Sequence, residues 1–192
     1  MNAEASLAPD NAYAVMIGTL RHFLDAISCS NADVATVQEL TMSMSSWIEQ
    51  LGPPQPESSE RVALGYPLPS RGRVMCPPFM IEKRSALRLV GSVVFGSFFL
   101  GRNGAAHGGA VAILFDEVFG QLANGPGQLR ARTAHLEVDF LRITPVDRTL
   151  QVEATIERQE GRKLALVGTL FDDQGPCARA SAVMVTLKEG QP

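Results

Sequence analysis

Residues 107–123 read HGGAVAILFDEVFGQLA, and this segment is the most informative part of the sequence for the fold. Its bulky apolar side chains recur at intervals of three and four residues, which places them on one face of an α-helix. The opposite face carries Ala112, Asp116 and Gly120, spaced by four. The run Gly125-Pro126-Gly127 ends the predicted helix. The bulky positions are Val111, Leu114, Phe115, Val118, Phe119 and Leu122.

Strands are predicted on both sides of this helix. Residues 133–142 and 150–157 alternate apolar and polar side chains, the period of a strand with one wet face. Residues 163–171 and 178–187 are apolar at most positions and flank a turn. Residues 86–100 are apolar on both faces, which predicts a strand covered by the helix on one side and by N-terminal helices or a neighbouring subunit on the other. The order predicts an α+β fold, with one helix packed on one curved antiparallel sheet.

The N-terminal part predicts a helical extension. Residues 11–51 carry two apolar stripes of helical period, and Ser30 or Asn31 is the expected cap of the second helix. Residues 52–73 are rich in Pro, Ser and Gly and are expected to form a linker or wrapping loop. We therefore expect an extension and linker over 1–60 and a second domain over 61–192.

Composition excludes several classes of function. The net charge of -3 and the pI of about 5.6 leave no basic field for nucleic acid. Cys29, Cys76 and Cys177 lie far apart, so we expect free thiols and no zinc site. No Lys or Arg precedes Arg21, unlike a secretory or mitochondrial leader. The longest apolar stretch, 89–100, falls short of the ~20 residues that span a bilayer. The expected location is the cytoplasm, without membrane contact.

The helix start favours a site for developing negative charge. The first N–H groups of a helix lack internal partners and carry partial positive charge, and Gly108 and Gly109 let a substrate oxygen approach them. Asp116 stands among small residues, where burial without a task would be costly. Gly109 and Asp116 are seven residues apart, or ~10 Å along a helix, too far to serve one carbonyl together. Two antiparallel helices from two chains meet this requirement, which favours a symmetric dimer with two shared sites.

The same stretch resembles the signature of hot-dog-fold acyl-CoA thioesterases, in particular the phenylacetic-acid-degradation type within the 4-hydroxybenzoyl-CoA thioesterase superfamily. The resemblance continues into TAHLEVDFLRITP at 133–145 and GRKLALVGTLFDDQGPCARASAVMVTL at 161–187, and it covers roughly 75–188. It implies a curved antiparallel sheet wrapped around one long central helix. It also implies hydrolysis of an acyl-CoA to free acid and CoA by a homodimer or homotetramer in lipid metabolism, without a metal or a cofactor other than the CoA of the substrate.

The resemblance also implies roles for individual residues. Asp116 matches the residue that activates water or attacks the thioester directly, and the Gly108 and Gly109 amides match the pair that polarises the carbonyl across a dimer interface. Asn103 matches a residue that helps to bind that carbonyl, and Thr133 one that orients the water from across the interface. His107 is either a general base or, as we favour, a structural residue of the turn. Coenzyme A carries phosphates, and the candidate cations are Arg142, Arg148, Arg162 and Lys163.

Two other functions compete with hydrolysis. A hot-dog hydratase or dehydratase uses a His–acid pair on the substrate's α-carbon, whereas here the acid lies in the helix that follows HGG. A non-catalytic acyl-CoA sensor, or a scaffold whose N-terminal helices bind a partner, has no need of Asp116. Glu117, one residue further on, is expected to be structural or solvated.

Overall fold

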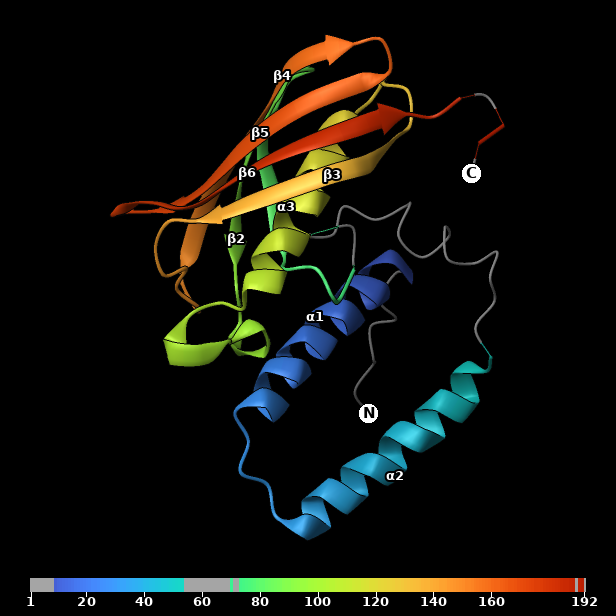
Figure 1. Cartoon of the computed structure of the whole chain (residues 1–192). Helices are drawn as coiled ribbons and strands as arrows, with labels where there is room; N and C mark the ends of the chain where they lie inside the picture. The colour runs from blue at the N-terminus through green and yellow to red at the C-terminus, as the bar shows by residue number, and fades with distance from the viewer. Residues whose placement is uncertain (1–8, 54–69, 71–72, 189, 192) are drawn as a thin grey trace.

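The chain folds into one antiparallel sheet, one long helix against it and two helices at the N-terminus (Figure 1). The computed structural model describes residues 9–53, 70, 73–188 and 190–191. The helical elements are α1 (Pro9–Ser28), α2 (Val34–Leu51), the 3-10 turns η3 (Ser97–Phe99) and η4 (Arg102–Gly104), and α3 (Gly108–Ala123). The strands are β1 (Phe79–Arg84), β2 (Arg88–Val94), β3 (Ala131–Phe140), β4 (Thr149–Glu160), β5 (Lys163–Asp172) and β6 (Gly175–Thr186).

The core lies between α3 and one face of the sheet, whose strand order is β1-β2-β4-β5-β6-β3. Every strand pair is antiparallel, and β4 and β5 alternate buried and half-exposed side chains. Phe115 and Phe119 of α3 are fully buried, each worth about 1.5–3 kcal/mol of transfer free energy. Gly168 of β5 leaves room for both rings, because a Cβ there would lie 3.1–3.2 Å from them. The predicted α+β fold is confirmed.

The prediction of one strand over 86–100 is wrong. Only 88–94 pair as β2, and there Leu89, Gly91 and Val93 are buried while Val90 and Ser92 are half-exposed. The chain then leaves the sheet at Phe95 and Gly96 and turns into η3. Phe95 and Phe99 still pack in or against the core, whereas Phe98 and Leu100 are exposed. The sequence analysis also missed β1, because only its first residue is buried and no two-residue period results.

The two N-terminal helices differ in how they pack. Helix α1 contacts η3. Of the two predicted covers for residues 86–100, N-terminal helices or a neighbouring subunit, the first is thus found over the segment after β2. Helix α2 is capped by Asp33, which accepts a hydrogen bond from the Thr36 N–H at 2.8 Å, and not by Ser30 or Asn31. It buries none of its residues and lies apart from the sheet in Figure 1. The predicted linker falls largely outside the described residues.

No described helix is both long enough and apolar enough to cross a membrane. Within the same residues, no group of His, Cys, Asp and Glu side chains is arranged to hold a metal ion. The three cysteines are free thiols, with Cys29 exposed and Cys76 and Cys177 buried.

Candidate active site

Helix α3 begins with a cap made by its own histidine. His107 is the N-cap residue, in an extended conformation (φ −61°, ψ 132°), and its Nδ1 accepts a hydrogen bond from the Gly109 N–H at 3.0 Å. A Cβ at Gly109 would lie 3.1 Å from that nitrogen, so glycine makes room for the ring. The HGG motif therefore closes a helix cap, and the Gly109 amide is occupied while the cap holds.

The Gly108 amide differs from its neighbour. Among the described residues no acceptor is recorded for its N–H, which is one of the first in the helix. Gly108 lines an open cavity of about 420 Å³ together with Ala106, Phe140, Ile143 and others. The ring of Phe140 lies so close that a Cβ at Gly108 would be 3.2 Å from it. Of the two predicted carbonyl-binding amides, that of Gly108 thus has no recorded acceptor among the described residues, and its residue lines a cavity.

Asp116 and Thr133 are brought together by the packing of α3 against β3. The Thr133 hydroxyl donates to Asp116 Oδ1 at 2.7 Å, and both residues are exposed. A bulge between Thr133 and His135 interrupts the pairing of β3 with β6 at this point. The two residues belong to the same chain, whereas the resemblance implied that Thr133 acts from across an interface.

Within one chain, the Gly108 amide and the Asp116 carboxylate lie far apart. Gly108 and Asp116 are eight residues apart on one continuous helix, which corresponds to about 12 Å along its axis. A carbonyl held by the Gly108 amide is therefore out of reach of the Asp116 carboxylate of the same chain.

Glu117 is buried and not solvated. It is 4% exposed, accepts a hydrogen bond from Gln121 Nε2 at 2.9 Å and lies 3.6 Å from Arg73 Nη1. The neighbouring Cys76 is no nucleophile at neutral pH, because burial raises the pKa of its thiol to about 11. These residues join α3 to the segment before β1, in keeping with the structural role expected for Glu117.

Asn103 has a backbone role in the loop before α3. It adopts a left-handed conformation (φ 59°, ψ 30°) within η4, which Asn tolerates better than most residues. The chain then continues through isolated bridges that join Leu100 to Ala106 and Ala105 to Pro145. Asn103 thus shapes the loop that leads into His107.

The four predicted phosphate-binding cations do not form one cluster. Arg142 forms an ion pair with Asp172 and also donates to Gln174 and the Gly175 carbonyl, so its guanidinium is committed to the β5–β6 turn. Arg148 lines a neighbouring cavity of about 510 Å³ together with Asp172. Arg162 and Lys163 lie at the other end of β5, about 30 Å away for a strand of this length.

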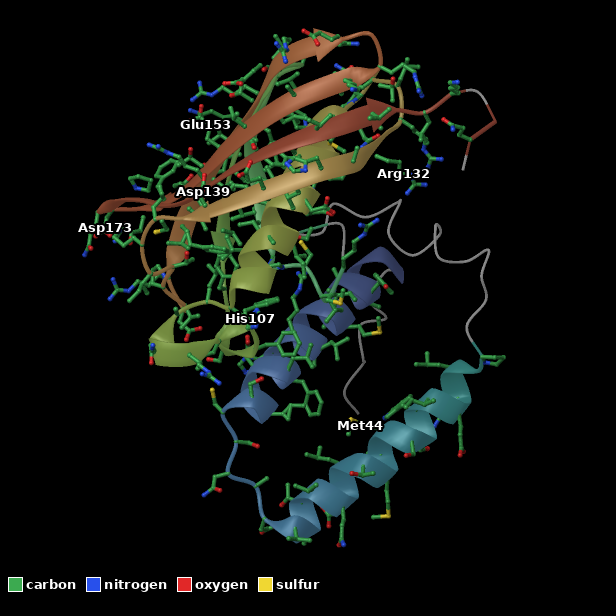
Figure 2. All side chains as sticks on the ribbon, in the orientation of Figure 1. Met44, His107, Arg132, Asp139, Glu153 and Asp173 are labelled. Atoms are coloured by element: carbon green, nitrogen blue, oxygen red, sulfur yellow. The ribbon has the colours of Figure 1, made fainter. Side chains whose placement is uncertain are left out.

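Arg132 joins Arg162 and Lys163 at their end of the sheet. Arg132 and Lys163 both pair with Val185 of β6, from opposite sides, and Arg162 Nη1 donates to the Thr186 carbonyl at 3.0 Å. Figure 2 shows Arg132 and Asp173 at opposite ends of the sheet. Arg132 directly precedes Thr133, so this basic end is also the end nearest the Asp116–Thr133 pair. Arg132 was not among the predicted cations, because only the strand register brings it next to them.

Comparison with known proteins extends this picture. The sequence model of the thioesterase superfamily matches residues 103–178, which include Gly108, Asp116 and Thr133. The human acyl-coenzyme A thioesterase THEM5 is 30% identical over 95 residues. That match covers 48% of this chain and 38% of THEM5, so the chain spans well under half the length of this curated relative.

Solved structures share the fold. A thioesterase superfamily protein of known crystal structure superposes with a TM-score of 0.69 at 24% identity, covering 94% of this chain and 96% of its own. A thioesterase from Streptococcus pneumoniae, crystallised with coenzyme A, superposes with a TM-score of 0.53 at 21% identity, covering 56% of this chain and 87% of its own. The sequence model of the thioesterase superfamily thus covers residues 103–178, and the six-stranded sheet with α3 has the hot-dog fold that these thioesterase structures share.

Proposed function

We propose that the protein is an acyl-CoA thioesterase that hydrolyses its substrate at sites shared between two copies of the chain. The observation that carries this proposal is the Asp116–Thr133 pair, an exposed carboxylate fixed by a hydroxyl at 2.7 Å within the superfamily segment. The match to THEM5, an acyl-CoA thioesterase, and the CoA in the pneumococcal structure support a CoA thioester as substrate. Two further structures of the pneumococcal protein carry alanine in place of an aspartate or a threonine, the residue types of this pair.

The chemistry follows from the two groups. The Thr133 hydroxyl occupies Asp116 Oδ1 and leaves Oδ2 to take a proton from water or to attack the thioester carbon itself. With water as nucleophile, its oxygen bonds to the carbonyl carbon and its proton passes to Asp116. The resulting oxyanion accepts a hydrogen bond from the Gly108 amide. Collapse then breaks the C–S bond, and the CoA sulfur leaves with the proton, giving the free acid and CoA.

A second copy is needed to complete the site. Because the Gly108 amide and Asp116 lie about 12 Å apart on one helix, we propose that two α3 helices lie antiparallel across a two-fold axis. Gly108 of the partner subunit then faces Asp116 of the first chain, and the reverse holds at the second site. A homotetramer built from such dimers satisfies the same requirement.

The basic end of the sheet is the proposed anchor for the CoA phosphates. Arg132, Arg162 and Lys163 meet there, beside the strand that carries Thr133. Arg142 is not proposed as a phosphate ligand, because its guanidinium forms an ion pair with Asp172. Arg148 lies at the opposite end of the sheet, where it lines a cavity together with Asp172.

The proposal is tested by thiol release from a panel of acyl-CoA chain lengths. Asp116→Asn removes the base or nucleophile from an exposed position, so we expect folding to be unchanged and kcat to fall by about 10²–10⁴. Unchanged hydrolysis by this variant excludes the assignment. Water addition to crotonyl-CoA, without thiol release, would identify a hydratase, and tight binding without turnover would identify a sensor.

The Gly108 amide is tested by a matched pair of variants. Gly108→Pro removes the N–H donor at the first helical position, where proline is tolerated, and His107 already has the extended conformation that a residue before proline prefers. Gly108→Ala keeps the N–H and adds a similar contact with Phe140. We expect the Pro variant to lose about 10²-fold in kcat relative to the Ala variant. Equal activity of the two variants would exclude Gly108 as the donor.

A further inference from the structure

Helix α1 supplies a cap to a helical turn far away in the sequence. The N-cap residue of η3 is Gly96, which has no side chain with which to cap the turn. Asp25 of α1 takes this place: its Oδ1 accepts a hydrogen bond from the Phe98 N–H at 2.7 Å, across 73 residues of sequence. A carboxylate that accepts an N–H of the first turn is the usual arrangement of an N-cap.

Gly96 makes room for this carboxylate. Its backbone is extended (φ −70°, ψ 175°), a conformation that any residue adopts, so glycine is not required there for its backbone. A Cβ at this position would lie 2.4 Å from each carboxylate oxygen of Asp25. Any side chain at residue 96 therefore displaces Asp25.

The turn η3 is also hydrogen-bonded to the start of α3. The Phe99 carbonyl accepts a hydrogen bond from the His107 N–H at 2.7 Å, and the Gly101 N–H donates to the Ala105 carbonyl, also at 2.7 Å. Leu100 and Ala106 form a β-bridge between these two contacts. A short series of contacts thus leads from Asp25 through Phe98 and Phe99 to His107.

The series ends at the proposed oxyanion donor. His107 caps α3 and directly precedes Gly108, so a shift of the His107 backbone moves the Gly108 N–H with it. Catalytic donors act over 2.7–3.1 Å, and a misplacement of about 1 Å costs up to about 10²-fold in rate. Arg21 Nη2 of α1 donates to the Arg73 carbonyl at 3.0 Å, a contact that leads to a different segment.

We propose that Asp25 is a positioning residue through which α1 fixes the turn that presents the Gly108 amide. This inference rests on the proposed thioesterase function for its consequence in catalysis, although the coupling of α1 to the turn stands on the contacts alone. It assigns the N-terminal extension a role in turnover as well as in packing.

The test compares Asp25→Ala, Asp25→Asn, Gly96→Ala and the double variant Asp25→Ala/Gly96→Ala, with Glu39→Ala on the exposed surface of α2 as control. The measurements are kcat and KM for acyl-CoA hydrolysis, and hydrogen exchange of the His107 amide. We expect Asp25→Ala and Gly96→Ala each to lower kcat about tenfold with little change in KM, and to speed exchange at His107. Asp25→Asn keeps an acceptor oxygen and retains most of the activity.

The double variant gives the sharpest prediction. Because Gly96→Ala acts by displacing the Asp25 carboxylate, the double variant is expected to be no worse than Asp25→Ala alone. Additive losses, or variants that lose stability while kcat and His107 exchange stay unchanged, would overturn the proposal. If the wild type hydrolyses no acyl-CoA, the proposed function fails, whereas His107 exchange still tests the coupling. If Asp25→Ala cannot be purified, Asp25→Asn and Gly96→Ala carry the comparison.

Discussion

At the level of single residues, the two glycines of the HGG motif differ in the contacts of their amides. The sequence analysis treated Gly108 and Gly109 as one pair of carbonyl-binding amides, because both occupy the first turn of the predicted helix. In the structure the Gly109 N–H donates to His107 Nδ1, whereas Gly108 lines a cavity and its N–H has no recorded acceptor among the described residues. Sequence spacing could not separate them, since the difference depends on the direction of the His107 ring, which folds back over the helix start.

This cap leads to a prediction that separates the two roles considered for His107. His107→Ala removes the acceptor for the Gly109 N–H and is expected to cost about 1 kcal/mol of unfolding free energy. His107→Asn supplies a new side-chain oxygen that caps well, so it is expected to restore stability and most of kcat. Urea unfolding and thiol release measure the two effects. Full stability with lost turnover in the Asn variant would make His107 a general base instead.

At the level of helices and strands, the spacing of apolar residues was enough to predict the elements that have one buried face and one exposed face. Helix α3 and strands β4 to β6 fall close to their predicted ranges, because each contrasts a buried side with a more exposed one over many residues. Strand β3 was predicted by its alternating sequence, although only Ala131 of it is buried. The run over 86–100 lacks that contrast, and the chain leaves the sheet at Gly96, where it contacts Asp25, 71 residues earlier. Strand β1 is short, with only Phe79 buried. Contacts between distant segments thus decide the elements that the sequence analysis misjudged.

The β5–β6 turn is fixed by an ion pair whose contribution depends on pH. The hydrogen bond from Arg142 holds the pKa of Asp172 below its usual value of 3.8. A lowered folded-state pKa stabilises the fold above the unfolded pKa, and this stabilisation is lost as pH falls through the folded pKa. Arg142→Gln is therefore expected to lower the free energy of unfolding at pH 7, with a difference from wild type that shrinks below about pH 4. Chemical denaturation between pH 7 and pH 3 measures this, with Arg148→Gln as control, and a difference that stays constant over that range would contradict it.

The two ends of the sheet are also expected to differ in their effect on substrate binding. Arg132→Glu and Lys163→Glu reverse charges at the end proposed to hold the CoA phosphates. We expect each to raise KM about tenfold, or about 1.4 kcal/mol, with kcat little changed and a stronger effect at low salt. Arg148→Glu, at the opposite end, is the matched control and is expected to leave KM near the wild-type value. A larger effect of Arg148→Glu would place the phosphates at the Asp172 end.

At the scale of the whole molecule, the question is whether one chain can complete a site. The sequence analysis inferred two chains from the spacing of Gly109 and Asp116, and the regular α3 helix keeps Gly108 and Asp116 about 12 Å apart. What the sequence could not supply is which surfaces of two copies meet. The exposed edge of β3 and the exposed face of α3 that carries Asp116 adjoin, since Thr133 bonds to Asp116 across them.

A mixing experiment decides between a shared site and a single-chain site. Asp116→Asn and Gly108→Pro each inactivate both sites of their own homodimer if Asp116 works with Gly108 of the partner subunit. A mixed dimer then has one intact site, formed by Asp116 of the Pro variant and Gly108 of the Asn variant. Unfolding and refolding the two together in equal amounts gives mixed dimers as half of the population, so about a quarter of wild-type activity is expected to return. Refolding each variant alone is the control, and activity that stays at the level of the separate variants would mean that each chain completes its own site.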